Sequence, residues 1–455
     1  MNALLHDAAT RAASYLDGLD ARKVAPDAAA AAALEALDMP MPAKGDDAAR
    51  VIADLDAFGS PATMAMAGPR FFGFVIGGAL PVTLAANWIA GAWDQNSAFY
   101  NATPATSRIE QIALRWLVEL LGLPAGTGGA FVTGATVANF AALAAARHVV
   151  LDRVGWNVEA DGLFGAPPIQ VIVGEEVHPS LVKSLGLIGL GRNRVVRVPV
   201  DGQGRMRADA LPKIATPSIV CTQAGNVNTG AIDPIDEICS RVEGSGAWIH
   251  VDGAFGLWAA GSPALASIVR GIERADSWAT DAHKWLNVPY DCGLAFSRDA
   301  EALRAAMAVT ADYLPSLSPF RNPADYTPEL SRRARGIEVW AALRALGREG
   351  VAELIERNCR QARRFAEGLR AGGHRVLNEM ALNQVLVAFG DADTTRRVIA
   401  AVQDDGTCWC GGTVWQGETA MRISVSSWAT TDADVEKSLA AILRVAKSAG
   451  AAPSR

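Results

Sequence analysis

Two segments decide the fold of this chain: WIHVDGAFGLWAA (residues 248–260) and DSWATDAHKWLNVPYDCG (residues 276–293). In the first, a short apolar run ends at Asp252. In the second, Lys284 is flanked by His283 and Trp285, between two stretches of strand-like composition. An acid at a strand end, with one lysine returning beside a histidine, suits a cofactor that needs a carboxylate at one end and an amine at the other.

Pyridoxal 5′-phosphate (PLP) is such a cofactor. A lysine amine forms a Schiff base with its aldehyde, and a carboxylate keeps its ring nitrogen protonated, so that the ring can accept charge from a substrate carbanion. We therefore predict that Lys284 is the Schiff-base lysine and that Asp252 is the ring-nitrogen partner. Either residue alone is more typical of a turn or of solvated surface, so the prediction rests on the pair.

The segment FVTGATVANFAAL (residues 131–143) predicts a site for the phosphate group. A short apolar run passes through a turn of small residues into an alanine-rich helix pattern. A helix start offers free backbone N–H groups and the positive end of the helix dipole, and small residues let a phosphate approach them.

Short apolar or β-branched runs alternate with helix-like segments along the middle of the chain, which predicts an α/β fold with a mostly parallel sheet that is buried on both faces. Ligands of such sheets bind beyond the carboxyl ends of the strands, where His178, Thr222 and Asp252 fall. The runs are residues 170–174 (QVIVG), 195–200 (VVRVPV), 219–222 (IVCT) and 248–252 (WIHVD).

The motifs HVDGAFG and DAHKWLNVPYDCG together resemble those of the group II PLP-dependent amino-acid decarboxylases, whose best-known members act on aromatic amino acids and on glutamate. The resemblance extends from about Gly68 to about Gly347. It implies the fold of the fold type I PLP-dependent transferases: a large domain with a mostly parallel seven-stranded sheet and a small C-terminal α+β domain. We expect a helical arm in residues 1–65, a cofactor-binding domain in residues 66–325 and the small domain in residues 326–455.

The resemblance also implies roles for single residues. Lys284 and His178 are the expected catalytic residues, with His178 stacked on the cofactor ring. Phe72 and Phe74, in a stretch similar to the family's P-x-F-F motif, are expected to line the substrate pocket. The expected cofactor contacts are Lys284, Asp252, Ala254, Gly134, Ala135, Thr136, His178, Thr222 and His283.

Two positions depart from the family pattern. Asp281 stands where many members have asparagine, and because a carboxylate repels a phosphate we leave it out as a ligand. The proline-rich residues 310–335 predict a mobile loop over the active site. Family decarboxylases carry a tyrosine there that protonates the carbanion, but the matching place falls near Asn322 or Pro323, and Tyr313 and Tyr326 are out of register.

Composition limits the possible functions. Of the 455 residues, 50% are hydrophobic and 20% are charged, and the net charge of −6 gives a nucleic-acid partner no electrostatic support. No signal peptide or membrane-spanning run is apparent, so we expect a cytoplasmic enzyme. The six scattered cysteines lack metal-ligand spacing and are read as buried free thiols, with no metal site.

Local patterns add two expectations. Residues 107–122 read as a helix with Ser107 as its cap and Gly122 as its stop. The alanine-rich first 60 or so residues read as helices joined by turns, which cannot bury their apolar faces alone. In the family, the equivalent arm packs on a second subunit, which implies a homodimer with the active site at the subunit interface.

The function predicted from the sequence is PLP-dependent decarboxylation of an L-amino acid to its amine and CO₂, with an aromatic substrate favoured by Phe72 and Phe74. The alternatives use the same cofactor and scaffold: an aldehyde synthase, an aminotransferase or an aldolase-type lyase. A non-catalytic relative that serves as a binding subunit is the rival from another class. The complete set of Asp252, Lys284 and His178 argues against it.

Overall fold

The computed structural model describes residues 1–309 and 320–450. The chain divides into two compact units. The larger unit comprises Ala79–Arg360 and Asn378–Gln384, and the smaller comprises Met1–Gly78, Gln361–Leu377 and the chain from Val385 on. Tyr313 and the first part of the predicted loop lie outside the described residues. In the described ranges, no helix is both long and apolar enough to cross a membrane.

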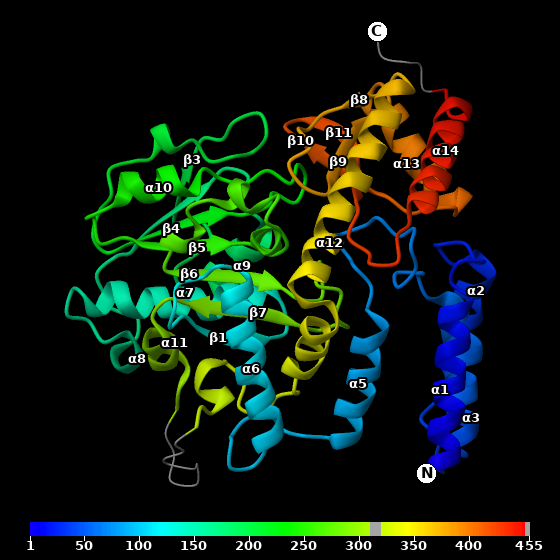
Figure 1. Ribbon diagram of the computed structural model, residues 1–455, viewed down its shortest axis with the longest axis horizontal. Helices are drawn as coiled ribbons and strands as arrows, with labels where there is room; N and C mark the ends of the chain where they lie inside the picture. The colour runs from blue at the N-terminus through cyan, green and yellow to red at the C-terminus, as the bar shows by residue number, and fades with distance from the viewer. Residues whose placement is uncertain (310–319, 451–455) are drawn as a thin grey trace. The chain divides into compact units, whose positions relative to one another are not determined.

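The larger unit contains a seven-stranded sheet with the order β1-β7-β6-β5-β4-β2-β3 (Figure 1). All neighbouring strands pair in parallel except β7, which is antiparallel to both β1 and β6. The predicted mostly parallel sheet is therefore confirmed. The strands are β1 (Gly128–Val132), β2 (Gln170–Gly174), β3 (Val195–Val198), β4 (Ser218–Gln223), β5 (Trp248–Asp252), β6 (Ser277–Asp281) and β7 (Gly293–Ser297).

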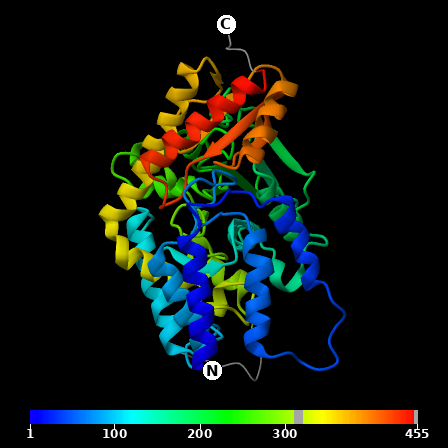
Figure 2. The same ribbon diagram turned by 90° about the vertical axis from the view of Figure 1, so that its right-hand side faces the viewer.

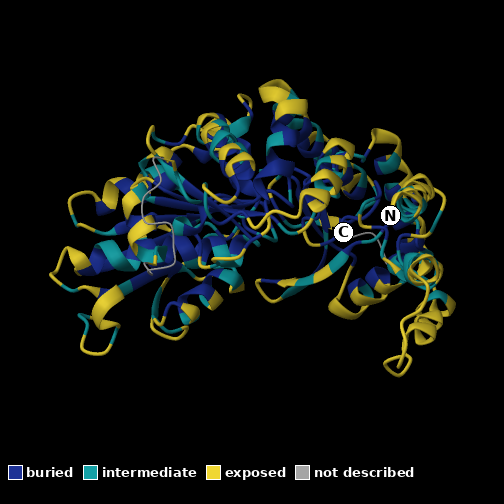
Figure 3. Ribbon diagram, turned by 90° about the horizontal axis from the view of Figure 1, so that it is seen from below, coloured by how far each residue is buried: buried dark blue, intermediate teal, exposed yellow. Residues whose placement is uncertain are grey.

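The centre of this sheet is buried on both faces, as its unbroken apolar runs predict. Every residue of β5, β6 and β7 is buried. Figure 3 shows buried segments, in dark blue, gathered in the interior of the larger unit. Helix α7 (Ala135–Asp152) packs across β5, β6 and β7 and buries a face of alanines. Small side chains let this helix lie close to the strands, and its first turn reaches the edge where β5 and β6 end.

The other helices of the larger unit surround this core. Helix α6 begins at Pro104, with Thr103 in the N-cap position, so the predicted start at Ser107 is wrong. Proline fits the first helical turn because it needs no hydrogen-bonded N–H, and Ser107 is buried one turn further on. The helices are α5 (Pro81–Trp93), α6 (Pro104–Leu120), α8 (Val158–Asp161), α9 (Pro179–Leu187), α10 (Ile235–Val242), α11 (Ala300–Met307) and α12 (Gly336–Ala371), which is kinked at Gly347 and continues into the smaller unit.

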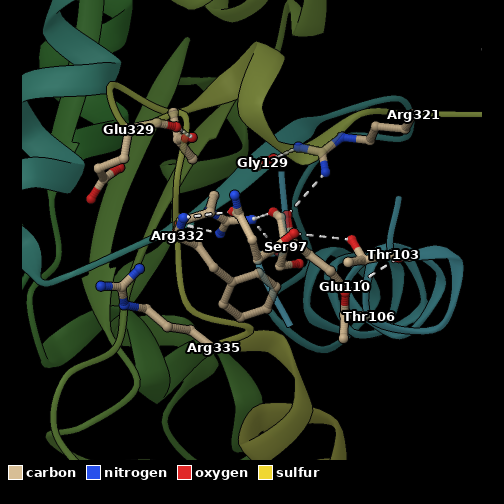
Figure 4. A network of polar contacts seen from close by, with 12 residues as sticks. Ser97, Thr103, Thr106, Glu110, Gly129, Arg321, Glu329, Arg332 and Arg335 are labelled. Atoms are coloured by element: carbon tan, nitrogen blue, oxygen red, sulfur yellow. Dashed lines mark hydrogen bonds and ion pairs between the residues drawn. The ribbon is translucent and has the colours of Figure 1, made fainter. Parts of the chain in front are cut away.

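A buried ion-pair network joins three segments of the larger unit (Figure 4). Glu110 of α6 accepts hydrogen bonds from Arg332 at 2.7 Å and from Arg321 at 3.2 Å. Arg332, whose side chain is 0% exposed, also donates to the carbonyls of Ser97 and Phe131. The network therefore fixes residues 321 and 332 to α6 and to the end of β1.

The smaller unit combines a helical arm with an α+β layer, while the predicted bounds of the three domains stay a prediction. Its sheet has the order β10-β11-β9-β8, with β8/β9 and β10/β11 antiparallel. In the arm, α1 and α3 lie side by side (Figure 2) and neither contains a buried residue. The elements are α1 (Asn2–Asp17), α2 (Ala28–Ala33), α3 (Ala48–Asp54), α4 (Ser60–Ala62), β8 (Arg375–Val376), β9 (Gln384–Ala388), α13 (Ala392–Asp405), β10 (Gly411–Trp415), β11 (Glu418–Ser424) and α14 (Asp432–Ser448).

Candidate active site

The candidate site lies in the larger unit, at the edge where the parallel strands end. β5 ends at Asp252 and β6 ends at Asp281, on neighbouring strands. The antiparallel β7 begins at the same edge with Gly293, so the loop of residues 282–292, which carries Lys284, stays at this edge. Sheet topology thus brings the predicted acid and the predicted amine to one place.

Asp252 is 3% exposed, and its carboxylate accepts hydrogen bonds from Asn139 Nδ2 at 3.1 Å and from the Ala254 N–H at 3.2 Å. Burial raises the pKa of this carboxyl group. The positive potentials of His178 and Lys284, and the two hydrogen bonds, act in the opposite direction. Asp252, Lys284 and His178 are therefore within electrostatic reach of one another.

A chain of buried hydrogen bonds supports Asp252 from behind. Trp248 Nε1 lies 2.8 Å from Ser277 Oγ, which lies 2.9 Å from His250 Nδ1. His250 Nε2 lies 2.8 Å from Asn139 Oδ1. Burial lowers the pKa of His250 to about 3, so the ring is neutral at pH 7 and donates only one hydrogen bond.

The donor and acceptor roles along these hydrogen bonds follow from Asp252, at which the series ends. An ionised Asp252 only accepts, so Asn139 presents its NH₂ to Asp252 and its oxygen to His250. The proton of His250 is then on Nε2, and Nδ1 accepts from the Ser277 hydroxyl, whose oxygen accepts from Trp248. Each member has one arrangement that satisfies its neighbour, which fixes the orientation of the Asp252 carboxylate.

The predicted phosphate-binding turn lies where α7 begins. Gly134 precedes the helix and supplies no side-chain cap, so the first backbone N–H groups of α7 need partners from elsewhere. The backbone of Gly134 lies against Gly293, where a Cβ atom would come within 2.5 Å of the Gly134 Cα. The Ala135 N–H donates to Asp281 Oδ1 at 2.6 Å, so a carboxylate already occupies part of this helix start.

Lys284 follows β6 by one short turn. Its Nζ lies 3.0 Å from Asp281 Oδ2, and its side chain is 20% exposed. The ring of His283 stacks on Tyr290 with centroids 4.2 Å apart, and His283 Nδ1 accepts the Cys292 N–H at 3.1 Å. Burial lowers the pKa of His283 and raises the pKa of Tyr290 to about 12, so both are uncharged at neutral pH.

The remaining predicted contacts are close to the same edge. His178 is the N-cap of α9, and its Nδ1 lies 2.7 Å from Ser180 Oγ and 3.2 Å from the Ser180 nitrogen. Thr222 is buried near the end of β4, donates to the His250 carbonyl at 3.2 Å, and lines a small cavity together with Asp252. Thr136 lies in the first turn of α7, where its carbonyl accepts from Ser184 at 2.7 Å.

Phe72 and Phe74 belong to the smaller unit. Phe72 is buried and packs edge-on against Phe365, with the two ring centroids 5.1 Å apart. Phe74 is 59% exposed and stacks on Trp409 at 5.6 Å. Their role as walls of a substrate pocket stays a prediction.

These residues suit pyridoxal 5′-phosphate in three respects. A buried carboxylate with fixed orientation could hold the ring nitrogen, an amine is available at Lys284, and a helix start flanked by glycine could take the phosphate. One feature opposes the phosphate: the negative charge of Asp281, which is 2% exposed. The carboxylate, the amine and the helix start therefore fit the cofactor, although the Asp281 carboxylate lies at the end where the phosphate would bind.

The sequence analysis did not single out His250, Ser277, Trp248 or Asn139 as members of the site. One signal was available for His250: alternate residues of a strand point to the same face, so His250 and Asp252 share a face of β5. A carboxylate repels a phosphate, but it can itself accept hydrogen bonds from a helix start, as Asp281 does from Ala135.

Comparisons with known proteins agree with this geometry. Residues 31–390 match the family model described as "Pyridoxal-dependent decarboxylase conserved domain". The chain is 27% identical over 401 residues to tryptophan decarboxylase 1 of Oryza sativa subsp. japonica, with 79% of this chain and 77% of that protein covered. It is 30% identical over 325 residues to the acidic amino acid decarboxylase GADL1 of Bos taurus, with 68% of this chain but only 61% of that protein covered.

Its fold is similar to that of a solved structure, Oryza sativa TDC with PLP and tryptamine. The TM-score is 0.91 at 22% identity, over 98% of this chain and 97% of that one. This likeness confirms the predicted fold class.

Proposed function

Because the chain belongs to the pyridoxal-dependent decarboxylase family, whose model it matches over residues 31–390, we propose that it is a carboxy-lyase that releases CO₂ from an L-amino acid. The cofactor is pyridoxal 5′-phosphate. The observation that supports the proposal best is the convergence of Asp252, Lys284 and His178 at one sheet edge, with Asp252 oriented by Asn139.

Each group of residues has its own task in this proposal. Lys284 would hold the cofactor through its side-chain amine. Asp252 keeps the ring nitrogen protonated, and the start of α7 holds the phosphate. His178, fixed by its contacts with Ser180, faces the substrate carboxylate region. The bound cofactor supplies the electron sink for the bond that breaks, which is chemistry that no side chain provides.

We propose an aromatic L-amino acid as the first substrate to test. Support for this choice is the sequence expectation that the aromatic residues Phe72 and Phe74 line the substrate pocket. The relatives named above include one protein called a tryptophan decarboxylase and one called an acidic amino acid decarboxylase. A substrate panel therefore has to include both classes.

The test combines spectroscopy with product analysis. We expect the purified protein to be yellow with bound cofactor, and borohydride to fix the cofactor on the wild type but not on Lys284→Ala. CO₂ and amine should then form from one or more of the proteinogenic amino acids, ornithine or 2,4-diaminobutyrate. A wild type that remains colourless with added cofactor would contradict the proposal.

The same reaction mixture distinguishes the alternative on this scaffold. No tyrosine was matched to the family's proton donor, and the Asn322 side chain near that place accepts the backbone N–H of Tyr100 at 3.1 Å. If, for lack of a proton donor, dioxygen oxidises the decarboxylated substrate and water releases its nitrogen, aldehyde, ammonia and hydrogen peroxide will accumulate in place of the amine. Measuring CO₂, amine, aldehyde and peroxide together decides between decarboxylase and aldehyde synthase.

We also propose that the active form is a homodimer. The support is the arm, in which exposed apolar side chains recur along α1, α3 and the turns between them; Leu5 is 60% exposed, Val51 51% and Leu55 58%. Figure 3 shows the helices near the N-terminus largely in yellow. Such a surface gains free energy when a second protein surface covers it.

A further inference from the structure

Asp281 contacts two parts of the site: the start of α7, which is the expected phosphate site, and the amine of Lys284, which is the expected attachment point of the cofactor. One carboxylate oxygen accepts the Ala135 N–H at the start of α7, at 2.6 Å. The other lies 3.0 Å from Lys284 Nζ and 3.7 Å from His283 Nε2. Asp281 therefore binds the helix start and the reactive amine at once.

The surroundings keep this carboxylate in place. Asp281 is the last residue of β6, its side chain is 3% exposed, and its carbonyl accepts the indole N–H of Trp258 at 2.9 Å. A Cβ atom on Gly134 would lie 3.5 Å from Asp281 Oδ1 and 3.3 Å from His283 Cε1, so the glycine leaves little spare room. Its burial and these contacts oppose a movement of the Asp281 carboxylate into solvent.

The start of α7 attracts anions because its N–H groups are open and the helix dipole is positive there. The Asp281 carboxylate satisfies part of this demand by accepting the Ala135 N–H. A phosphate group bound at the same helix start would lie close to a fixed negative charge, and like charges repel strongly where water is scarce. Asp281 also holds the Lys284 amine in an ion pair, and this pair must loosen before the amine can react.

We propose that Asp281 is a positioning residue that weakens the binding of pyridoxal 5′-phosphate and reduces the preference of the site for the phosphorylated cofactor over pyridoxal. An amide at this position would still accept the Ala135 N–H, but it would carry no charge against the phosphate. This inference rests on the proposed role of Lys284 as the residue that binds the cofactor. A weakly bound cofactor occupies only part of the protein molecules. We therefore expect the bound fraction to rise and fall with the concentration of free pyridoxal 5′-phosphate.

The test compares two aldehydes that differ only in the phosphate. The full chain, stripped of cofactor, is titrated with pyridoxal 5′-phosphate and with pyridoxal, and Kd is measured from the visible absorbance. For Asp281→Asn we expect the Kd of the phosphorylated aldehyde to fall relative to that of pyridoxal. Loss of the ion pair to Lys284 affects both aldehydes alike and cancels in the ratio of the two Kd values, so this ratio isolates the phosphate and should change about tenfold.

Asp291→Asn is the matched control, because Asp291 lies in the same loop but pairs with Arg335 at 2.9 Å. Its ratio of Kd values should equal that of the wild type. The inference is overturned if Asp281→Asn changes both Kd values by the same factor, leaves both unchanged, or raises that of the phosphorylated aldehyde relative to that of pyridoxal, provided that its thermal midpoint shows a folded protein. If the wild type forms no borohydride-reducible adduct, the proposed function fails instead, so the two failures are distinguishable.

Discussion

His250 shows how one buried side chain can control the orientation of a distant carboxylate. It is 0% exposed and bridges Ser277 to Asn139, which in turn holds Asp252. The bridge requires a neutral ring, because a protonated His250 would present a second N–H to Ser277 and a charge to a dry interior. Protonation therefore disturbs both the hydrogen-bond chain and the core around it.

We predict that His250 makes the folded protein sensitive to acid. Its pKa is lowered from the ordinary 6.5 to about 3, so the unfolded chain binds a proton at pH 5 that the folded chain does not. The stability that a neutral His250 provides is complete above about pH 6.5 and is lost as the pH falls towards 3. Between pH 7 and pH 5 the loss should be about 2 kcal/mol of unfolding free energy.

Urea denaturation followed by tryptophan fluorescence at the two pH values measures this loss. In His250→Gln the drop between pH 7 and pH 5 should be smaller by about that amount, although the variant starts less stable. His6→Gln changes an exposed histidine of α1 and should keep the wild-type drop. An equal drop in His250→Gln and wild type would show that other groups cause the acid sensitivity.

At the scale of elements, helix α6 offers a matched pair of carboxylates. Glu110 is 1% exposed and binds two arginines, whereas Glu119 is 57% exposed and pairs with Arg348 at 3.2 Å. A buried ion pair that loses one partner leaves an uncompensated charge, and an exposed pair loses little. The two sites therefore differ in the environment of the charge and lie on the same helix.

We predict that Glu110→Gln lowers the unfolding free energy by about 3 kcal/mol, because Arg332 remains buried without a counter-charge. Glu119→Gln should cost less than about 1 kcal/mol. Chemical denaturation of both variants at pH 7 measures the difference. Equal losses would mean that burial does not decide the strength of the Glu110 network shown in Figure 4.

The elements themselves were largely predictable from local patterns. The runs 170–174 and 248–252 coincide with β2 and β5, because unbroken apolar strands suit a sheet that is covered on both faces. The start of α6 was misplaced because a serine resembles a cap, while Pro104 had already begun the helix. The reversed direction of β7 depends on pairing with β1 and β6 and leaves no local trace.

At the scale of the whole chain, the site residues that lie at or just after strand ends could be predicted from the sequence. Asp252 and Lys284 follow runs whose carboxyl ends meet at one edge, so their proximity followed from topology. The role of Asn139 did not, because it depends on how α7 crosses β5 in the folded chain. Asp281 was excluded by its charge, yet that charge is what the helix start binds.

The proposed assembly of two chains leads to the last prediction. Val51 and Leu55 lie four residues apart in the helical arm, on one face, and are 51% and 58% exposed. If a second copy covers this face, the protein in solution will have about twice the chain mass of 47.7 kDa. Replacing both residues by aspartate would bury two charges at the interface and should raise the dimer dissociation constant about a hundredfold or more.

Sedimentation velocity over a range of protein concentrations tests this expectation. Val414→Asp is the control, because Val414 lies on β10, outside the arm, and is 65% exposed. It should sediment like the wild type, while the double variant dissociates on dilution. The cofactor absorbance of the dissociated double variant then shows whether the site needs the second chain: if it is retained without catalysis, the partner contributes to turnover but not to cofactor binding. A wild type that sediments as a single chain at all concentrations would contradict the homodimer. The exposed apolar face of the arm would then have to be covered by a different protein.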